Sequence, residues 1–253
     1  MPPSNSPKVL LLAGPPASAA LWRDVQARLS SRLPVEALEL FDPLPADPTV
    51  AGLAASVADR ARALGGDVVI VAHGAALPVA WRAAEAVSAR ALVLSDGPLT
   101  RLDPVLGALC GVARSPRLLA HTVLQPSFLR TWLSSSAGLR RAAINPYVAD
   151  RDTVVALLEP LTRSSAHRLA VARFLQSLPP ALGERPRFQG PTLLCWGDSD
   201  PLYPPKVADE GRLFFPNLET IAIEGGQHLH PLERPWAMAD TVAEWLTRQG
   251  IAT

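Results

Sequence analysis

The sequence has 253 residues, of which 48% are hydrophobic and 19% charged, and this composition excludes a disordered chain and a fibrous repeat. The 24 basic and 23 acidic side chains leave a formal charge of +1 with no dense basic run, which argues against nucleic-acid and anionic-membrane binding. We therefore expect one domain, or one domain with an insertion, that binds a small and largely apolar molecule.

Two cysteines, Cys110 and Cys195, are too few for a disulfide framework or a zinc site, and they indicate isolated thiols in a reducing compartment. No apolar run reaches the ~18 residues that a membrane-spanning helix needs. No metal-ligand spacing and no phosphate-binding glycine pattern occurs. We therefore predict a cytoplasmic protein that uses no metal and no cofactor, and we make no prediction of its oligomeric state.

Short apolar runs alternate with longer helical stretches along the chain. This alternation predicts an α/β fold with a mainly parallel sheet and helices on both faces. The expected strands are, in chain order, residues 9–13, 35–40, 68–72, 91–94, 192–196 and 219–223. The expected core helices are residues 50–64, 75–90 and 235–249, and the last of these carries Trp236, Met238 and Trp245 as candidate packing residues.

Residues 98–187 contain no convincing strand and consist of helical segments interrupted by prolines. A structureless loop of that length is not expected inside a compact domain. We therefore predict a helical cap at residues 98–187, inserted between core segments 1–97 and 188–253. Its large side chains either cover a pocket or pack the cap onto the core; the main candidates are Phe128, Trp132, Tyr147 and Phe174.

Three segments carry motifs that point to one family. The turn after strand 68–72 reads His-Gly-Ala-Ala, residues 196–200 read Trp-Gly-Asp-Ser-Asp before Pro204, and residues 226–235 read Gly-Gln-His-Leu-His-Pro-Leu-Glu-Arg-Pro. In this order they resemble the nucleophile elbow, the acid turn and the histidine loop of the α/β-hydrolase superfamily. Gly14, followed by Trp22, resembles the first-strand motif of the same superfamily, although Ala13 replaces its histidine. The resemblance implies an α/β-hydrolase fold of six core strands.

Carried over residue by residue, the resemblance makes Asp200 the acid, His228 the base and Gly74 the occupant of the nucleophile position. Glycine has no side-chain nucleophile, so no acyl-enzyme can form there. His73 is no substitute, because it matches the variable position of the elbow; a shift by one residue would put Val71 where a small residue is required.

The oxyanion hole of the superfamily is also incomplete in this sequence. Of its two backbone N–H donors, one is retained at Ala75, but the loop after the first strand continues with Pro15 and Pro16, which have no N–H. Loss of one such donor costs on the order of 3 kcal/mol of transition-state stabilisation. Loss of a serine nucleophile costs roughly a millionfold in rate. The sequence therefore argues against ester or amide hydrolysis by the serine route.

The remaining catalytic candidate is a histidine oriented by a carboxylate. We predict that His228, paired with Asp200, transfers a proton to or from an apolar small molecule in an elimination, cyclisation, addition or isomerisation, as in non-hydrolytic members of the superfamily. Asp96 is an alternative position for the acid. The residues expected to bind the ligand are Gly74, Ala75, Pro15, Trp22, Ser95, Asp96, Phe128 and Trp132.

Two other interpretations stay open at this point. The protein binds a ligand or a partner without turnover, or it is a hydrolase whose serine was exchanged for Gly74. Exchange of Gly74 for serine and an assay with activated esters would separate the hydrolase from the other two.

Overall fold

The computed structural model describes residues 6–133 and 151–252, and a parallel sheet forms the centre of this part of the chain. Its strands lie in the order β2-β1-β3-β4-β5-β6, and every neighbouring pair is parallel. The strands are β1 (Lys8–Ala13), β2 (Val35–Leu38), β3 (Val68–His73), β4 (Ala91–Ser95), β5 (Thr192–Gly197) and β6 (Leu218–Ile223). The α/β prediction is confirmed, and the sheet is parallel throughout rather than mainly parallel.

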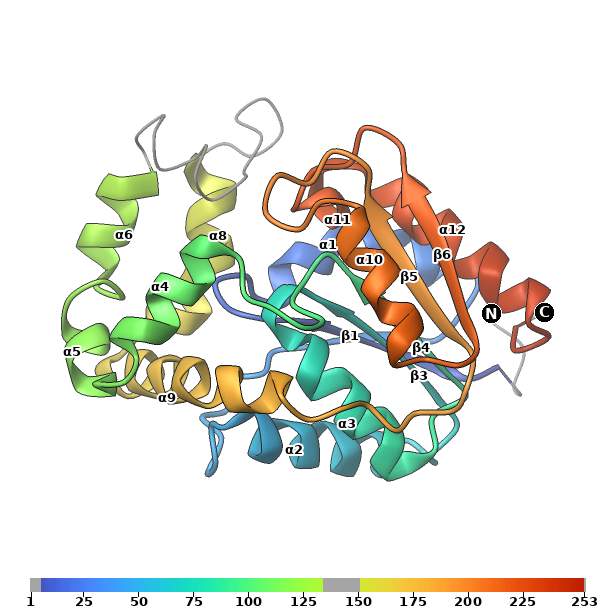
Figure 1. Ribbon diagram of the computed structural model, residues 1–253, viewed down its shortest axis with the longest axis horizontal. Helices are drawn as coiled ribbons and strands as arrows, with labels where there is room; N and C mark the ends of the chain where they lie inside the picture. Colours follow the sequence, from blue (N-terminus) through green and yellow to red (C-terminus); the bar gives the residue numbers. More distant parts are fainter. Residues whose placement is uncertain (1–5, 134–150, 253) are drawn as a thin grey trace.

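Helices cover both faces of this sheet (Figure 1). The helices are α1 (Arg23–Leu29) and α12 (Pro235–Arg248) on one face, and α2 (Val50–Ala63) and α3 (Leu77–Val87) on the other. Successive side chains of β1 alternate between the faces: Leu10 and Leu12 pack with α2 and α3, whereas Val9 and Leu11 pack with α1 and α12. Burial on both faces explains why β3 and β4 read as continuous apolar runs.

The described helices between β4 and β5 belong to the segment in which the cap was expected (Figure 1). They are α4 (Pro104–Val112), α5 (Pro116–His121), α6 (Pro126–Leu133), α8 (Arg151–Thr162) and α9 (Ser165–Leu182). Three prolines that the sequence analysis treated as breaks begin α4, α5 and α6, where the missing N–H costs no hydrogen bond. Helix α9 also contacts the core helices α2 and α3, so it connects the helices between β4 and β5 to the core.

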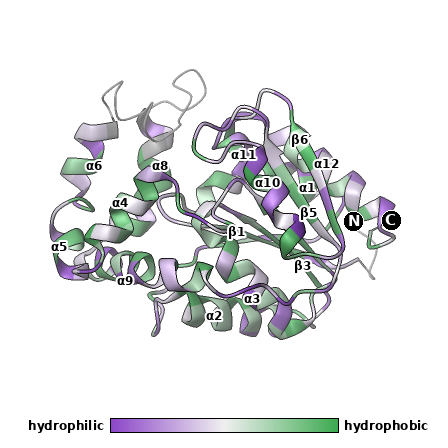
Figure 2. Cartoon of the chain, viewed as in Figure 1, coloured by the Kyte–Doolittle hydropathy of each residue, from purple (hydrophilic) through white to green (hydrophobic). Residues whose placement is uncertain are grey.

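The structure decides between the two expected roles of Phe174 in favour of packing: it is fully buried on α9 and meets the ring of Phe41 edge-on at a centroid distance of 5.9 Å. The expectation for Trp236 is wrong. Trp236 does not pack, since 69% of its surface is exposed, whereas Met238 and Trp245 of the same helix are buried. Figure 2 colours α2 and α3 by hydropathy, and both helices contribute buried hydrophobic residues to the core. No described helix is long and apolar enough to span a bilayer.

Candidate functional site

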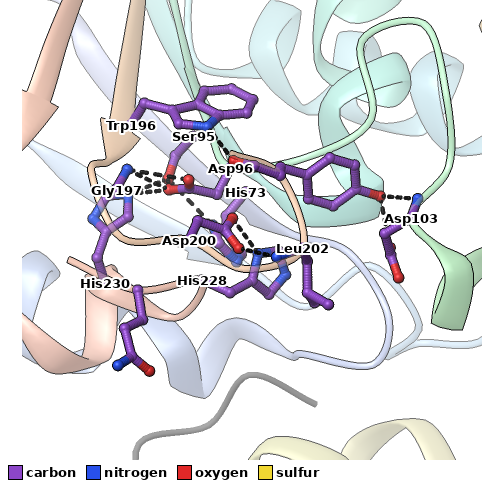
Figure 3. Close-up of polar contacts among 12 residues, drawn as sticks. His73, Ser95, Asp96, Asp103, Trp196, Gly197, Asp200, Leu202, His228 and His230 are labelled. Carbon is purple, nitrogen blue, oxygen red and sulfur yellow. Dashed lines mark hydrogen bonds and ion pairs between the residues drawn. The ribbon is translucent and has the colours of Figure 1, made fainter. Parts of the chain in front are cut away.

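The carboxyl ends of four neighbouring strands bring polar side chains to one place (Figure 3). His73 is the last residue of β3, and Asp96 follows β4. Asp200 lies in the loop after β5, and His228 lies in the loop between β6 and the short helix α11 (His230–Glu233). Parallel sheets bind ligands at this edge, because the loops after the strands converge there.

His228 and Asp200 form a directly hydrogen-bonded pair. Nδ1 of His228 donates to Oδ2 of Asp200 over 2.9 Å, and the backbone N–H of Leu202 donates to Oδ1 of the same carboxylate over 2.7 Å. The Asp200 side chain is fully buried, while 13% of the His228 side chain is exposed. With its proton on Nδ1, a neutral His228 carries its lone pair on Nε2, the nitrogen opposite the carboxylate.

The pair also changes the proton affinity of its members. Burial lowers the pKa of His228, but the hydrogen bond and charge of Asp200 outweigh burial, so the pKa is above the usual value for histidine. Burial raises the pKa of Asp200, and the hydrogen bonds from His228 and the backbone bring it below the usual value. His228 therefore holds a proton more tightly than free imidazole does.

A second, fully buried polar network lies beneath this pair. Ser95 Oγ is 3.2 Å from Nδ1 of His73 and 2.8 Å from Nε2 of His230. Nε2 of His230 is also 2.5 Å from Oδ2 of Asp96, and Asp96 accepts the backbone N–H of Gly197. The side chains of His73, Ser95, Asp96 and His230 are at most 1% exposed.

Burial shifts the pKa values of this network toward the uncharged forms. Burial and the charge of the neighbouring Asp200 carboxylate raise the pKa of Asp96 well above its usual value. Burial and the charge of His228 lower the pKa of His230 to about 4. Burial, His228 and His230 lower the pKa of His73 well below its usual value. These directions favour the uncharged forms of His230 and Asp96 in the contact between them.

We expect exchange of Asp96 for asparagine to remove part of the pH dependence of stability. Unfolded Asp96 ionises above 3.8 but stays protonated in the folded state to a higher pH, so the free energy of unfolding falls by up to ~1.4 kcal/mol per pH unit in that window. Asparagine does not titrate, and it tolerates the positive φ of 28° at this position. Urea unfolding of both proteins between pH 4 and 8 measures the slopes; equal slopes would contradict a neutral Asp96.

A cavity of about 510 Å³ lies above His228, between the sheet edge and the helices of residues 98–187. The loop 14–17, the turn His73-Gly74-Ala75 and His228 contribute to its wall. The remaining lining is mostly aliphatic and comes from α4, α6, α8 and α9. The polar lining of the cavity comes from the carboxyl ends of β3 and β6, with His73 and His228, and also from the loop after β5, from α8 and from the residue before α4, with Tyr203, Thr162 and Asp103.

The structure places the predicted site residues in two groups. Some of them line the cavity: Pro15, Gly74, Ala75, Phe128, Trp132 and His228. Trp22, Ser95 and Asp96 do not line it, contrary to expectation, because each is fully buried behind the cavity wall. Asp200 is also buried, as the partner of His228, and Asp96, the alternative acid, instead contacts His230 and Asp200. Tyr147 lies outside the described residues.

Sequence reasoning missed three residues at the site. His73 lines the cavity, although its motif position assigned it no role. Tyr203 also lines it, and its hydroxyl donates to Asp103 Oδ2 over 2.8 Å, which joins the loop after β5 to the N-cap residue of α4. The sequence signal for Tyr203 and Asp103 was weak: Tyr203 lies near the acid turn, and Asp103 precedes a proline that starts a helix. Among the described residues, no cluster of three or more His, Cys, Asp or Glu side chains is arranged to hold a metal ion.

Comparisons with known proteins agree with this architecture. The sequence model of the alpha/beta hydrolase family matches residues 9–241. A search of curated proteins finds no match. A thermophilic esterase from Thermogutta terrifontis superposes with a TM-score of 0.73 at 19% identity, covering 98% of this chain and 91% of the esterase. Haloalkane dehalogenase DbeA from Bradyrhizobium elkani superposes with a TM-score of 0.72 at 19% identity, covering 99% of this chain and 92% of DbeA. A putative ancestral haloalkane dehalogenase superposes with a TM-score of 0.76 at 19% identity, covering 100% of this chain and 95% of the dehalogenase.

Proposed function

The chain belongs to the alpha/beta hydrolase family, and we propose that it transfers protons through His228 rather than forming a covalent ester intermediate. His228, oriented by Asp200, acts as general base and then as general acid on a largely apolar small molecule. The reaction class is elimination, cyclisation, addition or isomerisation. The observation that carries this proposal is the position of Gly74.

Gly74 stands where the family's elbow motif has its nucleophile. It follows β3 directly, opens the 3-10 turn Gly74–Ala76 and has a positive φ of 63°. A Cβ atom built on Gly74 would meet no heavy atom within 4 Å. The position therefore offers space in the cavity that His228 also lines, but no hydroxyl, thiol or carboxylate that could attack a substrate.

The loop after β1 supports the same proposal. Residues 14–17 line the cavity, yet none of them offers a free backbone N–H: Gly14 donates to His73, Ala17 donates to Gly14, and residues 15 and 16 are prolines. Of the turn residues that line the cavity, Gly74 donates its N–H to the carbonyl of Asp96, which leaves the N–H of Ala75 as the donor for an oxyanion in the described part of this wall. This arrangement lacks the two-donor stabilisation on which ester hydrolysis depends.

The lining favours an apolar substrate that is deprotonated at carbon. Aliphatic walls exclude water and strengthen the electrostatic effect of the few polar groups. The neutral Nε2 of His228 accepts a proton, Asp200 stabilises the imidazolium that results, and the same proton returns to another substrate atom. No step in this sequence requires a nucleophile at position 74.

The experiment that tests the proposal compares two model substrates. We expect the protein to open the ring of 5-nitrobenzisoxazole with saturation kinetics: the C–H proton passes to His228, the N–O bond breaks, and a nitrile and a phenolate form. With 4-nitrophenyl butyrate we expect no burst and no acylated protein by mass spectrometry. An acylated protein, or ring opening no faster than with free imidazole, would refute proton-transfer catalysis and favour hydrolysis or ligand binding alone.

Exchange of Gly74 for serine tests the nucleophile position directly. We expect the variant to fold with a loss of about 1–2 kcal/mol, because the positive φ strains a residue with a Cβ. Its hydrolysis of 4-nitrophenyl butyrate should stay within about tenfold of the parent, since a hydroxyl cannot compensate for the absent oxyanion donor. Stopped-flow kinetics measures this, and a burst with acylation at position 74 would instead identify a hydrolase that lost its serine.

A further inference from the structure

Asp103 is a nearly buried carboxylate at the wall of the cavity. It is the residue before α4, it lines the cavity, and only 7% of its surface is exposed. The backbone N–H groups of Val105 and Leu106 donate to its Oδ1 over 2.8 and 3.0 Å, and the hydroxyl of Tyr203 donates to its Oδ2 over 2.8 Å. A side chain that accepts from three donors is the ionised carboxylate, and its position before a helix N-terminus favours the negative charge.

This carboxylate has no counter-ion in the described part of the chain. Within residues 6–133 and 151–252, no lysine, arginine or histidine forms an ion pair with Asp103. The described residues that line the cavity include neither lysine nor arginine. Hydrogen bonds compensate only part of the cost of burying a charge, so the position of Asp103 at a ligand cavity points to a ligand that supplies the opposite charge.

The N-terminus of α4 has no N–H group to spare for an anion. A helix N-terminus binds anions through its free N–H groups, and Pro104, Val105 and Leu106 of α4 all line the cavity. Pro104 has no N–H, however, and the N–H groups of Val105 and Leu106 both donate to Asp103. The hydroxyl proton of Tyr203 also goes to Asp103. This part of the wall therefore carries negative charge and leaves no donor for an anionic group.

Tyr203 connects this charge to the proposed base. Its hydroxyl bonds to Asp103, and its ring centroid is 5.7 Å from that of His228 at an interplanar angle of 34°. Burial lowers the pKa of His228, the hydrogen bond and charge of Asp200 raise it, and the charge of Asp103 is among the smaller effects that raise it further. A ligand at His228 therefore lies within reach of the Asp103 charge, because electrostatic effects extend further in an apolar cavity than in water.

We propose that Asp103 determines the charge preference of the cavity, which binds apolar molecules that carry a protonated amine or amidine and disfavours those that carry a carboxylate or phosphate. Capping of α4 alone does not require this charge, because asparagine and serine cap a helix as well as aspartate does. The inference rests on the proposed function in taking the cavity as the substrate site. It narrows the substrate class from apolar molecules in general to apolar cations.

The first test measures binding and does not depend on turnover. Three probes share one shape and differ in the charge of the head group: 4-butylbenzamidine is a cation, 4-butylbenzamide is neutral and 4-butylbenzoate is an anion. Calorimetric titrations are run above the titration midpoint of His228, so that its ring does not attract the anion. We expect 4-butylbenzamidine to bind about tenfold or more tightly than 4-butylbenzoate. Equal affinities, or a parent that does not bind 4-butylbenzamidine, overturn the inference.

The second test removes the charge and keeps the helix cap. Asp103→Asn and Asp103→Ser both retain an oxygen that accepts the N–H groups of α4. Relative to 4-butylbenzamide, we expect 4-butylbenzoate to bind about tenfold more tightly to each variant than to the parent, and 4-butylbenzamidine about tenfold more weakly.

The matched control for these variants is Asp47→Asn. Asp47 also accepts a backbone N–H before a helix, that of Thr49 at the start of α2, but it is exposed and is not among the cavity-lining residues. Its exchange should leave the affinity ratios of the three probes unchanged. Thermal unfolding of each variant controls for folding, and Asp103→Ser with the parent titrations decides if Asp103→Asn does not fold.

The outcomes separate this inference from the proposed function. If the folded Asp103 variants keep the affinity ratios of the parent, Asp103 only caps α4 and the inference is wrong, whether or not the parent opens 5-nitrobenzisoxazole. If Asp47→Asn shifts the ratios as much as the Asp103 variants do, the net charge of the protein rather than Asp103 is responsible, and the inference is again wrong. If the ratios shift as expected but the parent does not open 5-nitrobenzisoxazole, the proposed function fails and the charge preference of the cavity stands.

Discussion

Exchange of His228 for alanine should lower kcat/KM for the opening of 5-nitrobenzisoxazole by roughly 10²–10⁴, the usual contribution of a general base. The imidazole of His228 bonds to the buried carboxylate of Asp200 through Nδ1 and leaves Nε2 to accept the substrate proton. Without the imidazole, Asp200 has no group through which it can promote proton transfer. Binding of 1-indanone, an apolar ketone used as a ligand probe, should survive, because the aliphatic lining is unchanged. Initial rates and ligand titrations on the same preparation measure the two effects.

A matched control for this variant is His121→Ala. His121 is an exposed histidine at the end of α5 and is not among the cavity-lining residues, so its loss should leave ring opening unchanged. Equal rates for parent, control and His228→Ala would mean that the cavity alone accelerates the reaction. That result would leave a binding protein in the alpha/beta hydrolase family as the remaining interpretation.

Exchange of Asp200 for asparagine should have an effect of similar size, roughly 10⁴ in kcat. The backbone N–H of Leu202 donates to one oxygen of Asp200, so the oxygen of asparagine stays at that position and its NH₂ group faces His228. Nδ1 of His228 then becomes the acceptor, and its proton moves to Nε2. A nitrogen that already carries a proton cannot act as the base.

The same variant has a defined pH signature. In the parent, kcat/KM should rise with pH through a His228 pKa above 6.5, since only the neutral imidazole accepts a proton. Without the negative charge of Asp200 that pKa falls, so the rising limb of the residual activity should move to lower pH. Profiles from pH 5 to 9 test this, with Asp198→Asn as control, because Asp198 is exposed in the same turn and bonds to Ser199. An unshifted limb would show that Asp200 does not hold His228.

The order of strands and helices in the core could be read from the sequence, because burial on both faces makes a parallel strand continuously apolar. The ends of elements were less accurate. The second strand was expected to reach residue 40 but ends at Leu38, and the helix after β3 begins with a separate 3-10 turn. Hydrophobicity varies gradually across such boundaries, whereas the backbone hydrogen bonds that end an element depend on its neighbours.

The sequence by itself determined the fold class and made the pairing of Asp200 with His228 the leading hypothesis, because both residues occupy recognisable motif positions. It also showed that the residue at the elbow position, Gly74, has no side chain that could act as a nucleophile. Only the tertiary structure showed that Asp200 rather than Asp96 bonds to His228. It also showed that Ser95 and Trp22 are buried outside the cavity lining and that His73 is one of the lining residues. The physical reason is the strand order: β3, β4, β5 and β6 are neighbours in the sheet, so residues more than 100 positions apart meet at their carboxyl ends. Local sequence patterns contain no signal for such contacts.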